Sequence, residues 1–591
     1  MSLLLTFINR AVESGIIWKL LNILPIISKL LLVISIGIIF GFVPMDGSFR
    51  NTYISENALM PNQAYSQFRE TEWNIVRGFR NEISDLKIWN LDIRNRIVRN
   101  WLDDFGLETD LFQTDYDSAF NNGIKSEVLY GILNGQRCDG TEAMLIAAPW
   151  YNSENNYNVG GVSVAVALTK FFTNWPVWSK NIILVIPETP GYDLRAWVES
   201  YHEDLKLTGG SIETAIILDY AMDSDSFDHL DVEYIGLNGG LPNLDIINTA
   251  IHVAENEGVK VSINGMQSFS KPSHEFSNRL QHIAVGLQKM ALAGLEPLKG
   301  HEAFSGWRIQ ALTLKAIGHG GNSDITTFGR IPEAVTRSVN NLLEKFHQSF
   351  FFYLLLSPKL FVSIANYIPA AILLSVSYAA MSIDAIVQTG FLTSNEKMIN
   401  IQTIEAFVLY LLSLVVSLLY RQFITLIKNR NLSIEQQGKF IMVLQVFFVF
   451  TSYKVYKPKK TTKILMQSIA FMHFSLALTL LLALNFGLCF GMGVLAYPMA
   501  LAVDKNISKI RQRILLLVSN PFIAIFFMYS FTQDRWSWNL FNVMVSSWDN
   551  MSCWTWPVVS CSWLTSWILI VLSCNGEQES VNKEPKSIKQ E

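Results

Sequence analysis

The stretch LIAAPWYNSENNYNVGG, residues 145–161, decides how the polar part of this 591-residue chain folds. An apolar, strand-like run ends at Ala148 and is followed by a loop crowded with amide and aromatic side chains. In many hydrolases a loop of this kind carries the catalytic groups. The stretch therefore raises the question of whether any side chain near it could bind a metal ion or activate a nucleophile.

Strands and helices alternate on both sides of this stretch. Runs rich in apolar and β-branched residues are predicted to be strands over 124–133, 141–149, 180–188, 211–219 and 311–316. Helical stretches are predicted near 160–173, 190–205 and 243–256, after two amphipathic helices over 63–84 and 92–105. This alternation predicts a largely parallel sheet covered by helices.

Residues at the carboxyl ends of the strands are the first candidates for a site. The order of elements resembles the zinc-dependent aminopeptidase fold, in which one strand ends in His-x-Asp, a later one in Glu-Glu and another in Asp. Here Trp150 replaces the histidine, Asn152 the aspartate and Thr189 the second glutamate. Indole offers zinc no lone pair, and an amide is a poor substitute for a carboxylate. Only Glu188 and Asp219 fit that pattern.

Two carboxylates without imidazole or thiolate partners make a weak zinc site, and His319 in GHGGNSD could replace one missing ligand at most. At Glu188 and Asp219 we favour loop hydrogen bonds over metal binding. The sequence has no G-x-S-x-G or P-loop motif, and Cys138 in the turn NGQRCDG has no histidine nearby. We therefore predict no catalytic residue, no metal and no cofactor.

Composition adds a membrane part to this polar part. Hydrophobic residues reach 50% and charged residues only 16%, which is unusual for a soluble enzyme. The net charge of -4 and the lack of a basic run interleaved with aromatics exclude nucleic-acid binding. The five cysteines form no paired C-x-x-C pattern, so the polar part is expected to fold without disulfides.

The first membrane segment is predicted over 20–43. This run is long enough to cross a hydrocarbon core of ~30 Å, and it lacks the cleavage site of a signal peptide. Arg10, Lys19 and Lys29 precede or begin it and Asp46 follows it, which places the N-terminus in the cytosol. We predict a cytosolic segment 1–19, a signal anchor 20–43 and a luminal α/β domain 44–350.

Residues 351–574 are predicted to cross the membrane seven more times before a cytosolic tail over 575–591. The apolar runs are 361–387, 404–427, 438–455, 464–484, 486–503, 514–531 and 554–574. Alternating passes place the basic loops 454–463 and 504–513 in the cytosol, but leave Arg421, Lys428 and Arg430 on the luminal side. A miscounted span within 464–503 would reverse every later segment. The predicted fold class is a multi-span α-helical membrane protein with a luminal α/β domain resembling the zinc aminopeptidase fold, metal ligands largely lost.

Three segments are predicted to lie near the membrane surface. TYISENALMP (52–61), just past the anchor, is either an ordered linker or a direct lipid or partner contact. LLEKFHQSFFFYLLL (342–356) is predicted to be an amphipathic helix running into the bilayer. The Trp-rich segment RWSWNLFNVMVSSWDNMSCWTW (535–556) is predicted to lie in the interface plane, with partner binding left open.

Five stretches together resemble one family: TYISENALMP (52–61), NWPVWSKNI (174–182), GLNGGLPNLDIIN (236–248), SVNNLLEKFHQSFFFYLLLSP (338–358) and FVSIANYIPAA (361–371). The chain is similar to the Gaa-type GPI-anchor attachment subunit of the GPI transamidase. That resemblance implies a membrane complex of the endoplasmic reticulum, which removes a C-terminal signal from a proprotein and joins the new carboxyl end to a GPI ethanolamine.

The resemblance also implies a non-catalytic subunit, because the peptide-cleaving cysteine of that complex belongs to a separate, caspase-like subunit. The luminal domain would then hold the GPI lipid, the proprotein signal or partner subunits. The role in GPI recognition of a proline in the family's last span is carried over to Pro557.

Two other classes of protein compete with this one: a membrane-anchored zinc aminopeptidase, and a transporter formed by the last seven spans. A transporter would bury ionisable residues in mid-membrane, whereas Asp384, Glu405 and Arg421 lie near span ends. The sequence leaves open which spans contact GPI, how many copies of the chain enter the complex, and whether the sequons at Asn431, Asn506 and Asn550 are used.

Overall fold

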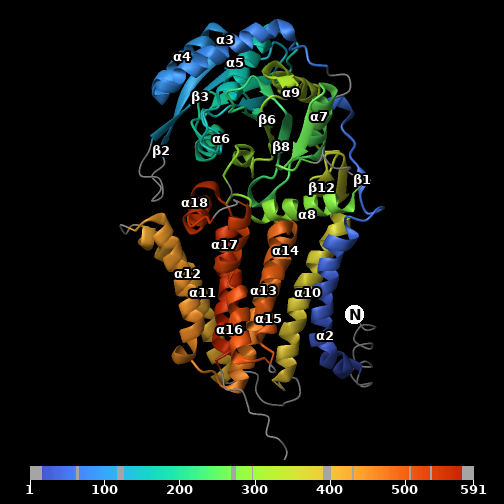
Figure 1. Cartoon of the computed structure of the whole chain (residues 1–591), viewed down its shortest axis with the longest axis vertical. Coiled ribbons are helices and arrows are strands. Elements are labelled where there is room, and N and C mark those ends of the chain that lie inside the picture. The colour runs from blue at the N-terminus through green and yellow to red at the C-terminus, as the bar shows by residue number, and fades with distance from the viewer. Residues whose placement is uncertain are drawn as a thin grey trace, which may run out of the picture.

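The computed structural model describes residues 16–60, 65–115, 125–267, 275–295, 297–389, 401–428, 432–504, 507–532 and 536–575. Figure 1 shows an α/β domain at one end of the molecule and a bundle of long helices at the other. The predicted fold class is confirmed, because the α/β domain is joined to helices apolar and long enough to cross a membrane. The sequons at Asn431 and Asn506, and nearly all of the predicted tail, lie outside the described residues.

An eight-stranded sheet forms the centre of the polar domain, in the order β2-β3-β5-β4-β6-β10-β8-β9. Its strands are β2 (Glu108–Asp115), β3 (Lys125–Leu133), β4 (Glu142–Ala147), β5 (Asn181–Ile186), β6 (Ser211–Asp219), β8 (His229–Glu233), β9 (Lys260–Ile263) and β10 (Gln310–Ile317). All the predicted strands are present, as β3, β4, β5, β6 and β10. The prediction of a largely parallel sheet is right for β5, β4, β6 and β10 and for the pair β8 and β9. The exceptions are β3, which runs antiparallel to β2 and β5, and β8, which runs antiparallel to β10.

Helices cover both faces of this sheet. On one face α5 (Val159–Thr173) packs with α3 (Trp73–Asp85) and α9 (Ile325–Asn340), and α7 (Leu244–Asn256) packs on α9. On the other face α6 (Tyr192–Glu203) places Trp197 and Tyr201 in a smaller apolar core. The helical stretches predicted between the strands are confirmed as α5, α6 and α7, and the two amphipathic helices as α3 and α4 (Leu91–Asp104).

A three-stranded sheet joins the polar domain to the two membrane helices that flank it. β1 (Arg50–Asn51), just after the anchor, pairs with β13 (Leu360–Ser363), which pairs with β12 (Tyr353–Ser357). The helix predicted over 342–356 is therefore wrong, since α9 ends at Asn340 and residues 353–363 form a hairpin. Every residue of β12 is buried, so this apolar run packs inside the domain and does not face lipid.

The stretch TYISENALMP is tied to the domain by backbone hydrogen bonds. The amides of Ser55 and Glu56 donate to Asp245 Oδ2 at 2.9 and 2.8 Å. The Glu56 carboxylate accepts hydrogen bonds from the amides of His347 and Gln348, each at 2.9 Å. Of the two interpretations of this stretch, the contacts favour an ordered linker.

Within the described ranges, five helices have the length and composition to cross a membrane. They are α2 (Ile16–Gly37) with the turn that follows it, α10 (Ile364–Gln388), α11 (Ile401–Lys428), α13 (Lys460–Leu484) and the last helix, in which α19 (Thr555–Val558) leads to α20 (Thr565–Ser573). A sixth is formed if α16 (Lys509–Val518) and α17 (Pro521–Thr532), bent by 55°, make one span. The bundle also holds α12 (Ile434–Val455) and the short pair α14 (Phe486–Leu495) and α15 (Tyr497–Leu501). Helices thus occupy all the predicted positions, and the number of crossings stays a prediction.

Polar contacts mark the two ends of the bundle. At the end away from the polar domain, Arg513 donates to Ser452 Oγ at 3.3 Å and to Asn575 Oδ1 at 3.1 Å. At the domain end, Arg421 of α11 forms an ion pair with Asp549 of α18 (Leu540–Met551). Arg421, one of the three basic residues that disagree with the predicted topology, therefore has an acidic partner.

The polar domain rests on the bundle through α8 (Phe276–Ala291), as Figure 1 shows. The side chain of Asn485 donates to Met290 O at 3.1 Å, and Ser547 Oγ of α18 donates to Gly294 O at 2.6 Å. A Cβ on Gly487 would stand 2.5 Å from Met290 Cβ, so α14 can cross α8 this closely only with glycine there. These contacts fix the domain to the bundle in addition to its two chain connections.

Candidate functional site

Trp150 follows β4, at the position where the zinc aminopeptidase fold has a histidine, and it is fully buried. Its indole Nε1 donates to Asn95 Oδ1 at 2.9 Å, and its ring stacks on Tyr157 with 5.9 Å between the centroids. The guanidinium of Arg94 lies over the same ring, 5.0 Å from the centroid. The indole therefore packs the strand end, and its one polar atom already has a partner.

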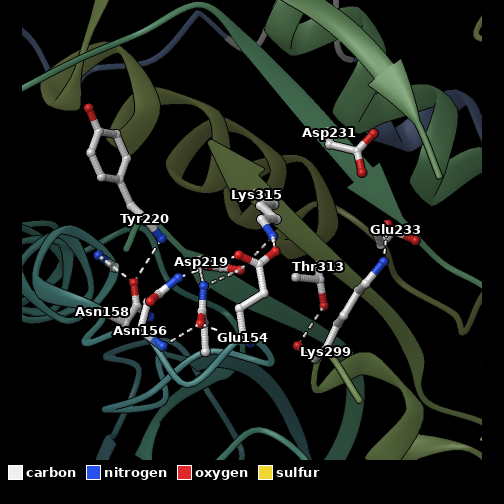
Figure 2. A network of polar contacts seen from close by, with 12 residues as sticks. Glu154, Asn156, Asn158, Asp219, Tyr220, Asp231, Glu233, Lys299, Thr313 and Lys315 are labelled. Carbon is white, nitrogen blue, oxygen red and sulfur yellow. Dashed lines mark hydrogen bonds and ion pairs between the residues drawn. The ribbon is translucent and has the colours of Figure 1, made fainter. Parts of the chain in front are cut away.

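Asp219, at the carboxyl end of β6, is buried against an amide and a lysine. Asn152 Nδ2 donates to its two carboxylate oxygens at 3.1 and 3.4 Å. The ammonium group of Lys315, from β10, lies 3.9 Å from Asp219 Oδ2 and also pairs with Glu154 (Figure 2). Burial raises the pKa of Asp219, and the Lys315 charge and the Asn152 hydrogen bond oppose that rise. The cation that compensates this carboxylate is a side chain of the domain itself.

Glu188 and Thr189, after β5, each bond to a close neighbour. Glu188 Oε2 accepts a hydrogen bond from Ser126 Oγ at 3.2 Å. Thr189 donates to Asp193 Oδ2 from its hydroxyl at 2.7 Å and from its amide at 3.0 Å. Burial raises the pKa of Asp193, which the Thr189 hydrogen bonds oppose. These contacts shape the turn into α6.

The five predicted positions do not converge on one point. Asn152 and Asp219 are in contact, whereas the other three each bond to a neighbour of their own. His319, the predicted substitute ligand, is exposed in the turn before β11 (Ser323–Asp324). Within the described part of the chain, no group of three or more histidine, cysteine, aspartate or glutamate side chains could hold a metal ion.

Asn158, a residue not singled out from the sequence, joins the carboxyl ends of β4 and β6 to the start of α5 (Figure 2). Its Nδ2 donates to Pro149 O at 3.0 Å and Leu218 O at 2.8 Å, and its Oδ1 accepts from the amides of Gly161 and Tyr220. A Cβ on Gly161 would stand 2.6 Å from Leu218 O, so α5 can begin this close to β6 only with glycine there. An asparagine ahead of Val-Gly-Gly is the helix-capping signal that could have revealed it.

A second buried ionic cluster lies at the end of β8 (Figure 2). Glu233 pairs with Lys299 and, at 3.2 Å, with Lys289. Although burial opposes it, these two ammonium groups hold the pKa of Glu233 well below its usual range. Burial and the charge of Glu233 raise the pKa of Asp231 to about 6. The adjacent cavity of about 30 Å³ has room for a water molecule and no larger ligand, so we assign this cluster to domain stability.

We expect the purified full-length protein to hold less than about 0.1 zinc per chain, because too few ligands converge for a tight site. Elemental analysis after exchange into metal-free buffer measures this, and a second sample equilibrated with equimolar zinc controls for incomplete loading. A content near one zinc per chain that falls in Glu188→Gln or Asp219→Asn would contradict the prediction.

Together, the fold and the strand ends define a membrane protein whose α/β domain resembles the zinc aminopeptidase fold. An indole, an amide and a hydroxyl stand where that fold has metal ligands. The chain belongs to the Gaa1-like, GPI transamidase component family, whose family model matches residues 125–571.

The chain is similar to two relatives in sequence and to several solved structures in fold. It is 40% identical to the GPI transamidase component GAA1 of Saccharomyces cerevisiae, over 99% of this chain and 100% of that protein. It is 28% identical to the GPI transamidase component gaa1 of Schizosaccharomyces pombe, over 58% of this chain and 61% of that protein. A solved structure of a glutaminyl cyclase from Porphyromonas gingivalis is 11% identical, with a TM-score of 0.30 over 47% of this chain and 98% of that one. A leucine aminopeptidase precursor from Bacteroides thetaiotaomicron is 12% identical, with a TM-score of 0.29 over 47% of this chain and 100% of that one.

Proposed function

We propose that this chain is a non-catalytic subunit of a GPI transamidase. In that role it holds the GPI lipid, the C-terminal signal of the proprotein or its partner subunits while the anchor is attached. The observation that carries the proposal is the full-length relation, with 40% identity over 99% of this chain and 100% of the Saccharomyces cerevisiae component. That relation includes the polar domain and the helical bundle together, which supports the same role for the whole chain.

The contacts at the strand ends support a non-catalytic role. Trp150 Nε1 donates to Asn95 and Asn152 Nδ2 donates to Asp219, while Asn152 Oδ1 accepts from the amides of Glu154 and Asn156. The competing function, a membrane-anchored zinc aminopeptidase, needs a metal-activated water. No observation on the described residues favours it. We assign the peptide-cleaving step to a separate, caspase-like subunit.

We further propose that the complex lies in the endoplasmic-reticulum membrane with the polar domain in the lumen. The charge bias around the predicted anchor supports this orientation. The contacts of Arg513 with Ser452 and Asn575 also support it, because they gather the two basic loops at the end of the bundle away from the domain.

The orientation predicts that protease added to intact microsomes will spare residues 50–350 and cleave within 454–463 or 504–513. Antibodies or tags at the domain and at each loop identify the fragments, and detergent-opened microsomes show that every site can be cut. Cleavage of the polar domain in sealed microsomes would reverse the topology.

The proposed function is tested by replacing the chain in cells whose own copy can be shut off and following a GPI-anchored reporter. The full-length chain should restore anchoring and should co-purify in mild detergent with a caspase-like subunit. Glu188→Gln should also restore anchoring nearly fully, since this carboxylate accepts a hydrogen bond from Ser126 and holds no metal in our proposal. Anchoring that continues without the chain would overturn the subunit role. Anchoring lost in a folded, assembled Glu188→Gln protein would overturn the non-catalytic role.

A further inference from the structure

The last span leaves one narrow stripe of its surface uncovered between residues 553 and 571. Between residues 553 and 571 every side chain is buried except Trp554, Pro557, Val558 and Cys561. Pro557 and Val558 each lie three or four positions from both Trp554 and Cys561, which places the four residues on one face of a helix. We call them the last-span stripe. Pro557, the residue to which GPI recognition was carried over, lies within it.

The backbone beneath this stripe is not a regular α-helix. A π-helical turn, Val559–Leu564, separates α19 from α20. Such a turn holds one extra residue and breaks the normal hydrogen-bond ladder, and it is frequent at functional sites. In a bilayer every carbonyl that the ladder does not satisfy needs another donor.

Side chains donate to several carbonyls of this segment in addition to its backbone hydrogen bonds. Ser560 Oγ donates to Trp556 O at 2.8 Å, Ser562 Oγ donates to Val558 O, and Thr565 Oγ1 donates to Ser560 O at 3.3 Å. All three donors belong to the last span itself. The carbonyl of the stripe residue Cys561, within the π-helical turn, accepts from His473 Nε2 of α13 at 2.9 Å. Among the described residues, His473 is the one side chain from another helix that bonds to a carbonyl of residues 555–564.

The two hydrogen-bond partners of His473 define which of its ring nitrogens carries the hydrogen. A carbonyl can only accept, so Nε2 carries the hydrogen. In the neutral ring Nδ1 is then an acceptor, and the hydroxyl of Tyr410 on α11 donates to it at 3.2 Å. The two rings are also in edge contact, with 5.4 Å between their centroids. One chain of hydrogen bonds therefore links α11, α13 and the π-helical turn.

We propose that His473, oriented by Tyr410, is a positioning residue that holds the π-helical turn and thereby directs the last-span stripe toward the GPI lipid. This inference rests on the proposed function of the chain. A turn of α-helix advances about 100° per residue, so loss of the extra residue would rotate Trp554, Pro557 and Val558 by about that angle against the buried half of the span. The stripe would then face neighbouring helices, and the lipid would lose its contact surface.

The experiment compares three variants of the full-length chain in its complex. His473→Leu keeps a side chain of similar size but removes the N–H donor. His473→Gln keeps an amide donor, and Tyr410→Phe removes only the hydroxyl that orients the ring. Met472→Leu, at the exposed neighbouring position, is the matched control. Amide hydrogen exchange over 555–566 reports on the turn, and the GPI recovered with the purified complex reports on its consequence.

We expect His473→Leu to speed exchange over 555–566 by at least tenfold and to lower GPI recovery several-fold, with partner subunits still recovered. His473→Gln should restore most of both signals, and Tyr410→Phe should fall between the two. If His473 only fills space, the leucine and glutamine variants should lose exchange protection and GPI recovery equally. That result would overturn the inference. Unchanged exchange in His473→Leu would overturn it as well.

A comparison with Pro557→Ala separates failure of this inference from failure of the proposed function. If His473→Leu speeds exchange but leaves GPI recovery intact while Pro557→Ala reduces it, the positioning role is wrong and the lipid-holding role stands. If both variants leave GPI recovery at the wild-type level, the lipid-holding role of the stripe is wrong, and the inference is overturned with it.

Discussion

Replacing Lys315 by methionine is expected to lower the free energy of unfolding of the polar domain by about 2–4 kcal/mol, because the buried Asp219 carboxylate loses its cation. Methionine keeps the length and most of the volume of lysine, so the apolar packing of β10 is preserved. The side chains of Lys315 and Asp219 are 17% and 7% exposed, which is why the expected cost is somewhat below that of a fully buried pair. Amide hydrogen exchange in β6 and β10 of the full-length protein measures it.

The loss should depend on pH. The folded-state pKa of Asp219 is raised above the unfolded-state value, mainly by burial. Stability from this group is therefore fully present below the unfolded-state pKa and is lost as pH rises through the folded-state pKa. Removing the Lys315 charge raises that pKa further. The difference in free energy of unfolding between Lys315→Met and the wild type should be small at about pH 4 and largest at neutral pH.

Lys359→Met is the matched control. Lys359 pairs with Glu255 at 3.0 Å, but its side chain is 64% exposed, and such pairs contribute about 0–1 kcal/mol. An equal loss in the two variants, or a deficit of Lys315→Met that does not change with pH, would show that Asp219 does not depend on this lysine.

Pro557→Ala is expected to lower the GPI recovered with the purified complex several-fold while assembly with partner subunits continues. Pro557 lies in the first turn of α19, after the N-cap Trp554, so its missing N–H leaves no carbonyl free inside the span. What the proline provides is a fixed backbone angle and a rigid ring on the last-span stripe. Alanine removes the ring and frees the turn that precedes the π-helical segment.

The measurement is mass spectrometry of GPI extracted from equal amounts of complex. Pro369→Ala is the matched control, because Pro369 is also half-buried and lies within another membrane helix, α10. Wild-type GPI recovery in Pro557→Ala would show that the carried-over role is wrong. Equal losses in both variants would trace the effect to helix stability in general.

The strands predicted from the sequence are those that a local pattern of apolar residues reveals. β4, β5 and β6 are short apolar runs buried on both faces, and each ends at a change of composition. β8, with the sequence HLDVE, is equally buried but was missed because it carries two carboxylates. Glu233 is tolerated there because Lys289 and Lys299 approach it from distant parts of the chain.

The hairpin at 353–363 was missed for a related reason. The run FFFYLLL suits a helix entering lipid as well as a strand. Its partner β13 is itself paired with β1, which lies about 310 residues earlier in the sequence. The site shows the same limit. The substituted positions Trp150, Asn152 and Thr189 could be located from the strand ends alone. Their bonding partners, and the part that Lys315 plays, depend on tertiary contacts that no local pattern reveals.

The pairing of β1 with β13 has a consequence for how the molecule is assembled. Its two strands close a loop of about 310 residues, and closing a flexible loop of that length costs about 5 kcal/mol of chain entropy. Folding of the domain therefore closes this loop before α10 packs in the bundle. Ser28 and Ser35 of α2 can then meet Ser377 and Ala370 of α10 as near neighbours. The folded domain thus acts as the template that pairs these two membrane helices, and a mutation that delays its folding should leave α10 in the bilayer without its partner.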